Sequence, residues 1–294
     1  MQMEPPRDRL VRPLMAPSAR RDRLLGVVLL LCAIAVIQLG ASIAKTLFAQ
    51  IGASGTVTLR LLLATALLWM IQRPWRTAVP RSAWPLLLAY GTALGLMNLL
   101  FYLSLRTVPV GLAVALEFSG PLTLTLAATR RLKDLPWLLL ALAGLAVLLP
   151  VRGVASVDPL GSACALGAGA CWAAYMITGR RLGGLLGKHA AAWGMPMALL
   201  WVLPFGCATA GWQMLQPSVL PTALAVAILS SAIPYPLEMA AMQRLPTRMF
   251  GVLLSLDPVM AALADWMVLG EALAPLQLAA IAAIMLASAG STRD

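Results

Sequence analysis

The sequence predicts an all-α membrane protein, and three observations lead to this prediction. Of its 294 residues, 61% are apolar and only 11% are charged, whereas soluble domains carry roughly 45–50% apolar and about 25% charged residues. The apolar residues form continuous runs, unlike the alternating strands of a membrane barrel. Because backbone inside lipid must satisfy its own hydrogen bonds, each run is predicted to be a helix. This composition excludes a soluble enzyme, a secreted disulfide scaffold and a disordered chain.

Ten apolar runs are long enough to cross a bilayer. A crossing of the hydrocarbon core, which is about 30 Å thick, takes about 20 apolar residues. The connections between the runs are short, so no extramembrane domain is expected. The predicted spans are residues 24–47, 55–72, 84–105, 108–129, 135–151, 159–180, 190–208, 218–241, 248–269 and 273–291.

The segment before the first span is rich in proline and arginine. Residues 1–23 are predicted to form a mobile cytoplasmic tail. A basic stretch followed by an apolar run is also typical of a signal peptide. However, residues 24–44 are uncharged over their whole length and no small-residue cleavage site ends them, so we predict an anchor helix.

The distribution of basic residues predicts the orientation. Eighteen of the 22 Lys and Arg residues fall on the side that carries both termini, six of them in the tail. The opposite side has only Arg106 and Arg152, with Lys45 near the end of the first span. By the positive-inside rule, both termini are predicted to be cytoplasmic. Topology therefore explains the net charge of +11, and no nucleic-acid partner is expected.

Two parts of the chain resemble each other at a fixed offset of 137 residues. Both contain a basic turn, a helix, an acidic turn and a further apolar helix. The division predicts a first repeat over residues 24–152 and a second over 159–291. Each repeat has five spans, so the second must be inverted relative to the first. The matched pairs are Pro109 with Pro246, Pro121 with Pro258, and Asp134 with Glu271.

Ten short-looped spans in two five-helix repeats resemble the drug/metabolite transporter superfamily, of the EamA type. The segments NLLFYLSLRTVPVGLAVALEFSGPL, GAGACWAAYMITGRR and AILSSAIPYPLEMAAMQRLPTRMFGVLLSLDP resemble its bacterial threonine/homoserine exporter branch. The resemblance covers residues 24–291. It implies a secondary transporter of the inner membrane that exports small neutral amino acids by alternating access. Export of aromatic amino acids, or of other small metabolites or drugs, is the alternative within the same fold.

Five ionisable residues lie inside predicted spans, where charge is costly and marks a cavity or a partner. Glu117 and Asp257 lie near the midplane of spans 4 and 9, and each is a candidate to bind a substrate ammonium or to take up protons during exchange. Glu238, toward the cytoplasmic end of span 8, is a further candidate. We expect Asp265 and Arg60 to be structural, with Arg60 able to snorkel to the outer interface.

Two prolines lie close to these acids. Pro121 removes the helical hydrogen bond to the carbonyl of Glu117, and Pro258 removes the bond to Leu254. Helix breaks that free carbonyl groups are common at the midplane sites of transporters. Pro121 and Pro258 are therefore predicted to be kink or gating positions.

Aromatic and polar residues within the spans complete the candidate site. Trp172 lies near the middle of span 6, with Tyr175 one turn further on. Packing and interhelical hydrogen bonding are the competing interpretation for each such residue. The remaining substrate-binding candidates are Ser42, Asn98, Tyr102 and Tyr235.

The sequence offers no catalytic, metal or cofactor site. His189 is the single histidine and lies in a polar connection, and the four cysteines lie in apolar runs without metal-ligand spacing. An intramembrane enzyme remains a remote alternative, because a membrane histidine and a GxGD-type motif are both missing. The expected partners are amino acids, protons and the lipid bilayer, and we expect a monomer without a cofactor.

The charge distribution makes a testable prediction about topology. A reporter fused after residue 294 should be cytoplasmic, and a reporter inserted near Gln213 should be periplasmic. Paired alkaline phosphatase and fluorescent-protein fusions measure this directly. Two tags on the same side of the membrane would refute the ten-span prediction.

Overall fold

The computed structural model describes residues 17–128 except 105 and 109, residues 158–257, and scattered residues between and beyond these ranges. The described residues form helices and their connections, without a strand. The predictions for residues 1–16, for most of spans 5 and 10, and for Asp265 lie outside the described residues. Four described helical stretches are long and apolar enough to cross a membrane: Arg20–Gln72, Arg81–Ser104, Pro159–Thr209 and Leu220–Arg244.

The first helix, α1 (Pro17–Gln72), contains two of the predicted spans. A straight helix of its 56 residues would be roughly 80 Å long, far more than one bilayer crossing. Gly52 interrupts it with a φ of 66°, a left-handed conformation that favours glycine. The interruption divides α1 into a first segment (residues 17–51) and a second segment (residues 53–72).

The start of α1 corrects one predicted boundary. The helix begins at Pro17, so residues 17–23, assigned to the tail from sequence, are helical. A proline suits the first turn of a helix, where its missing N–H is not needed. No glycine or proline follows before Gly26, so the basic residues extend the helix beyond its apolar part.

The next four long helices match predicted spans 3, 4, 6 and 7. They are α2 (Trp84–Ser104), α3 (Val110–Ala128), α5 (Pro159–Leu186) and α6 (Ala190–Thr209). Helix α5 is longer than its predicted span and ends before Gly187, which has a φ of 55°. Short turns connect these helices: η1 (Pro74–Arg76), η2 (Arg81–Ala83), η4 (Gly187–His189) and η5 (Gly211–Leu215).

The predicted single helix over residues 218–241 is interrupted in the structure. Helix α7 (Leu220–Ala227) leads into a π-helical turn, η6 (Ile228–Ala232), and α8 (Pro234–Arg244) follows. The amide of Ile233 donates to the carbonyl of Ile228 over 3.0 Å, five residues back. Because Pro234 has no amide hydrogen, the regular bonding pattern cannot continue through it. Helix α9 (Thr247–Leu254) also ends in a turn, after which Asp257 is helical again.

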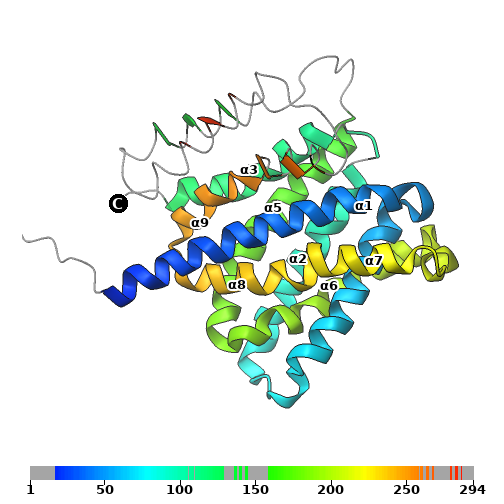
Figure 1. Ribbon diagram of the computed structural model, residues 1–294, viewed down its shortest axis with the longest axis horizontal. Helices are drawn as coiled ribbons and strands as arrows, with labels where there is room; N and C mark the ends of the chain where they lie inside the picture. The colour runs from blue at the N-terminus through cyan, green and yellow to red at the C-terminus, as the bar shows by residue number, and fades with distance from the viewer. Residues whose placement is uncertain are drawn as a thin grey trace, which may run out of the picture.

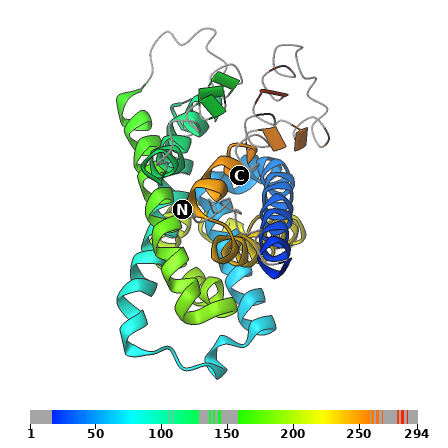
Figure 2. The same ribbon diagram turned by 90° about the vertical axis from the view of Figure 1, so that its left-hand side faces the viewer.

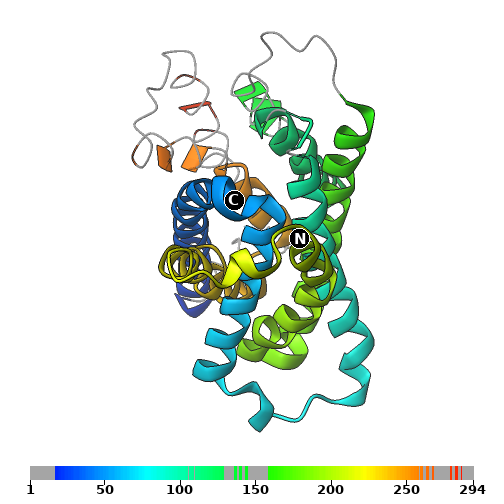
Figure 3. The same ribbon diagram turned by 90° about the vertical axis from the view of Figure 1, so that its right-hand side faces the viewer.

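Long helices pack as antiparallel pairs. The first segment of α1 lies along α7 and α8, as Figure 1 shows, with Gly26 against Leu245 and Gly40 against Ser230. In the views of Figures 2 and 3, this segment is seen nearly end-on, and α5 lies on the other side of α9. Within the described residues, α2 and α5 form the matching pair on that side.

The second segment of α1 packs against α6 in the opposite direction. The hydroxyl of Thr58 donates to the carbonyl of Val202 over 2.9 Å. Near the other end, the indole of Trp69 donates to the carbonyl of Ala192 over 2.8 Å. These bonds satisfy polar side chains that would otherwise lie unpaired in an apolar bundle.

The outer surface of the bundle is apolar. Large hydrophobic side chains are exposed on several helices, an arrangement that a soluble monomer rarely shows over wide areas. A lipid environment accounts for it, because lipid tails solvate such side chains. Examples are Leu24, Val28, Met70, Leu160, Leu166, Leu200 and Phe205.

Among the glycines that the structure describes, the tightest backbone contact lies between α3 and α5. A Cβ atom added at Gly120 would lie 1.8 Å from the carbonyl oxygen of Gly169. A Cβ at Gly169 would lie 2.4 Å from the carbonyl oxygen of Glu117. Both clashes involve backbone, so no side-chain rotation can relieve them.

We predict that Gly169→Ala destabilises the protein by roughly 1–3 kcal/mol, the usual cost of overpacking. The thermal midpoint of the purified protein in detergent measures this. Gly184→Ala is the matched control on the same helix, because its added Cβ would meet only the Gln243 side chain at 3.9 Å. Equal midpoints for both variants would contradict the predicted contact.

Candidate functional site

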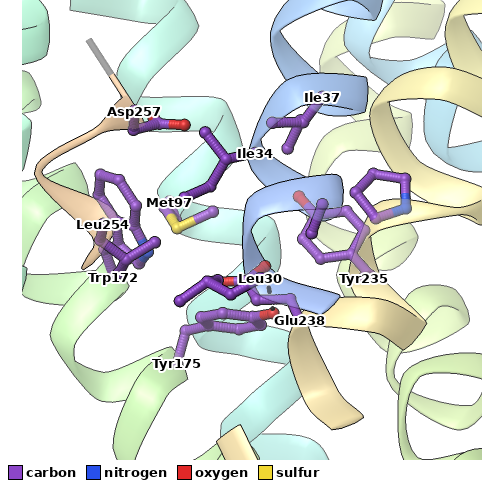
Figure 4. Close-up of a pocket in the computed structure, with 12 residues that line it drawn as sticks. Leu30, Ile34, Ile37, Met97, Trp172, Tyr175, Tyr235, Glu238, Leu254 and Asp257 are labelled. Carbon is purple, nitrogen blue, oxygen red and sulfur yellow. Dashed lines mark hydrogen bonds between the residues drawn. The ribbon is translucent and has the colours of Figure 1, made fainter. Parts of the chain in front are cut away.

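A cavity of about 60 Å³ lies inside the bundle. It has room for a few water molecules, at roughly 10–15 Å³ each. The first segment of α1, α2, α5, α8 and the region of α9 each contribute to its wall, as Figure 4 shows. The lining residues are Leu30, Ala33, Ile34, Ile37, Met97, Trp172, Tyr175, Pro234, Tyr235, Glu238, Leu254 and Asp257.

Two carboxyl groups stand in this otherwise mostly apolar wall. Glu238 accepts a hydrogen bond over 3.1 Å from the hydroxyl of Tyr175, and the side chain is only 8% exposed. Asp257 accepts a hydrogen bond from the side chain of Gln38. The cavity therefore has hydrogen-bond acceptors contributed by two helical regions, each held by a partner on another helix.

Local helix structure aims these side chains at the cavity. Tyr235 and Glu238 are three residues apart on α8 and so share one face. Trp172 and Tyr175 have the same spacing on α5. Asp257 follows directly after the turn that ends α9. The interruptions of the predicted spans thus lie at the cavity wall.

Aromatic rings frame the acidic part of the cavity. The rings of Tyr175 and Tyr235 meet edge to face, with centroids 6.1 Å apart. Tyr90 stacks against Tyr175 at 5.1 Å, in a tilted arrangement. Phe118 meets Trp172 at 6.2 Å. Such pairs stabilise the geometry beyond simple burial, so the hydroxyl of Tyr175 is well positioned to donate to Glu238.

The structure brings together five of the nine residues that the sequence singled out for substrate binding. Trp172, Tyr175, Tyr235, Glu238 and Asp257 all line the cavity. The sequence did not identify the aliphatic wall on α1. Its members follow helical spacing, which defines a face but does not tell what that face packs against.

The other four candidates lie outside the cavity lining. Asn98 is one step behind the wall, because its amide donates over 3.4 Å to the hydroxyl of Tyr235. Ser42 donates back to the carbonyl of Gln38 over 3.1 Å. The ring of Tyr102 packs edge to face against Phe48, at 5.8 Å.

Glu117 is the fourth residue outside the lining. It is partly buried on α3, close enough to Asp257 for the two carboxyl groups to interact electrostatically. Helix α3 continues through Pro121, so this proline does not end the helix. The carbonyl of Glu117, which Pro121 cannot bond, lies at the contact with Gly169 rather than in the cavity wall. The predicted role of Pro258 lies outside the described residues.

Arg60, predicted to be structural and able to snorkel, lies inside the bundle. Instead of snorkelling to the outer interface, its side chain is only 5% exposed and donates a hydrogen bond to the side-chain oxygen of Asn98. The expectation rested on depth along the span alone. The face of the helix that carries Arg60 turns inward, and depth gives no information about that.

The described residues contain no group of histidine, cysteine and carboxylate side chains that could hold a metal ion. Cys32, Cys164, Cys171 and Cys207 are all free thiols. The chemistry available at the cavity is therefore hydrogen bonding and ion pairing. A small polar molecule could bind there between acceptors and donors.

We predict that Tyr175→Phe destabilises the protein by roughly 1–3 kcal/mol, since the buried Glu238 carboxyl loses its donor. A double-mutant cycle with Glu238→Met, which removes the acceptor at similar side-chain length, measures the coupling by thermal unfolding in detergent. The two changes should be non-additive. Strict additivity would contradict a direct hydrogen bond between these side chains.

Comparisons with known proteins assign this fold to a family. The EamA-like transporter family matches residues 159–293. The threonine/homoserine exporter RhtA of Escherichia coli (strain K12) is 51% identical over 269 residues, which cover 91% of each chain. The threonine/homoserine exporter RhtA of Salmonella typhimurium (strain LT2) is 48% identical over 269 residues, which also cover 91% of each chain.

A solved crystal structure of a protein shares the fold. It has a TM-score of 0.75 and 18% sequence identity, covering 92% of this chain and 96% of the other. The extent of the similarity to the exporters, together with the apolar helices, shows a multi-pass membrane protein of a transporter family rather than an enzyme. The chain belongs to the threonine/homoserine exporter branch of the EamA-like, drug/metabolite transporter superfamily.

Proposed function

We propose that this protein exports small neutral amino acids, with threonine and homoserine as the leading substrates. One observation carries the proposal: a small cavity inside the bundle has two carboxyl groups in a mainly apolar wall. The relatives at 51% and 48% identity are named threonine/homoserine exporters.

The cavity offers partners for each part of such a molecule. Glu238 and Asp257 are acceptors for the ammonium group. The hydroxyl of Tyr235 and the indole of Trp172 are donors in the same wall. The aliphatic face of α1 provides an apolar surface for a short side chain. Every one of these contacts is non-covalent, as transport requires.

Alternating access between two inverted repeats is the proposed mechanism. The division into residues 24–152 and 159–291 is supported by the packing pattern. Span 1 pairs with span 8 (α7 and α8), and span 6 (α5) pairs with span 3 (α2). When the first repeat is matched to the second, span 1 corresponds to span 6 and span 8 corresponds to span 3. The two helix pairs are therefore equivalent, as two inverted repeats require. We place the protein in the bacterial inner membrane with both termini cytoplasmic, on the basis of its basic residues.

An uptake panel in reconstituted vesicles tests this function. Vesicles preloaded with threonine should accumulate labelled threonine and homoserine by exchange, whereas phenylalanine should exchange weakly, because the relatives are named as threonine/homoserine exporters. Vesicles that contain the protein but no internal threonine are the control. Failure to exchange any amino acid would reject the proposal, and preferential phenylalanine exchange would favour the aromatic alternative.

Proton coupling is tested at Asp257, because this carboxyl lines the cavity and interacts electrostatically with both Glu117 and Glu238. We expect Asp257→Asn to lower flux driven by a pH gradient about ten-fold or more and to lower exchange at symmetric pH by less, because Glu238 remains as an acceptor for the ammonium. Glu117→Gln is the comparison, since it neutralises a nearby carboxyl outside the cavity lining. A parallel loss of both modes in Asp257→Asn would show that this residue binds the ammonium without coupling transport to protons.

A further inference from the structure

Arg60 is a cation inside the bundle that the proposed function has not used. It lies on the second segment of α1, and its side chain is 5% exposed. A guanidinium group keeps its charge under all physiological conditions. A charge at membrane depth is costly and requires compensation from protein groups or from a ligand. The surroundings of Arg60 therefore indicate whether protein groups or a ligand compensate its charge.

The compensation around Arg60 is incomplete. One terminal nitrogen donates to the neutral side-chain oxygen of Asn98. The guanidinium also lies over the ring of Tyr102, 5.8 Å from its centroid, at cation–π distance. Its Nε atom is buried and has no hydrogen-bond partner. Among the residues that the structure describes, no carboxylate forms an ion pair with Arg60.

A chain of polar side chains connects Arg60 to the cavity. Asn98, which accepts from Arg60, also donates to the hydroxyl of Tyr235, and Tyr235 lines the cavity. In Figure 4, Asp257 and Tyr235 lie across the cavity from each other, and Glu238 lies one helical turn from Tyr235 on α8. Behind Tyr235 lies a positive charge without a carboxylate partner among the described residues.

We propose that Arg60, with Asn98 and Tyr235, binds the carboxylate of the transported molecule, so that the site selects zwitterions. The inference rests on the proposed function and names the substrate class: a molecule with an ammonium and a carboxylate on one carbon. The ammonium binds toward Asp257 and Glu238, and the carboxylate toward Tyr235 and Arg60. A carboxylate provides the negative charge and the acceptor lone pair that Nε of Arg60 lacks.

The first test uses the unchanged protein. Threonine, threonine amide and threoninol share the ammonium and the side chain, but only threonine has a carboxylate. We expect the amide and the alcohol to compete for labelled threonine uptake about 10- to 100-fold more weakly than threonine does, the range for one charged hydrogen-bonded contact. Equal competition by all three would overturn the proposal without any variant.

The second test uses Arg60→Gln. Its KM for threonine should rise about 10- to 100-fold, while competition by threonine amide should stay as in the parent, so that discrimination between the two disappears. Arg60→Lys keeps the charge and should retain part of the discrimination. Arg106→Gln is the control, because Arg106 is exposed in the turn after α2. A structural role for Arg60 would lower threonine and amide transport alike and would overturn the proposal.

The two proposals fail in different ways. If the unchanged protein moves no amino acid, the proposed function fails. If it exchanges threonine but does not discriminate against the amide, the function stands and the role of Arg60 fails. Discrimination in the parent that persists unchanged in Arg60→Gln would leave zwitterion selection in place but exclude Arg60 as its source.

Discussion

The structure depends on one constraint: a polar side chain inside the bundle must find its partner within the protein, on its own helix or on another, because lipid offers none. The described residues meet it with three sets of contacts around the cavity. Tyr175 joins α5 to Glu238 on α8, and Gln38 joins α1 to Asp257. Arg60 and Asn98 join the second segment of α1 to α2, and through Tyr235 to α8. The polar contacts that hold the helices together are therefore also the wall of the proposed site.

The helices themselves could be predicted from hydropathy, because continuous apolar runs leave no other structure for the backbone. The interruptions were harder to predict. Residues 218–241 are apolar throughout most of their length, so they read as one span, although Pro234 and Pro236 stand inside them. The structure instead places a π-helical turn before Pro234. A proline pair was the available signal, since it removes two backbone donors within one helical turn.

The site was predicted less completely, for a geometric reason. Depth along a span can be read from residue counting, and it singled out Asp257 and Glu238, which line the cavity. The direction in which a side chain points requires an amphipathic pattern, and helices that are apolar on all sides have none. Glu117 and Arg60 show the result. Glu117 had the favourable depth but lies outside the cavity lining, whereas Arg60, expected to be structural and able to snorkel, has a buried side chain.

The helix interruptions and the polar contacts occur at the same place, and this bears on how such a site could open to either side. Tyr235 and Glu238 follow the π-helical turn, and Asp257 follows the turn after Leu254. At such breaks, regular backbone hydrogen bonds are already absent, so a change in helix direction costs fewer bonds than it would in mid-helix.

The first segment of α1, by contrast, is unbroken where it lines the cavity. Motion of α8 against α1 would carry Tyr235 and Glu238 together, because both follow the π-helical turn. A zwitterion bound between these residues and Arg60 would then favour the arrangement in which the helices lie close together. Its ammonium and its carboxylate would both lose their partners if the helices separated. The charges that select the substrate would thereby also couple its binding to the movement.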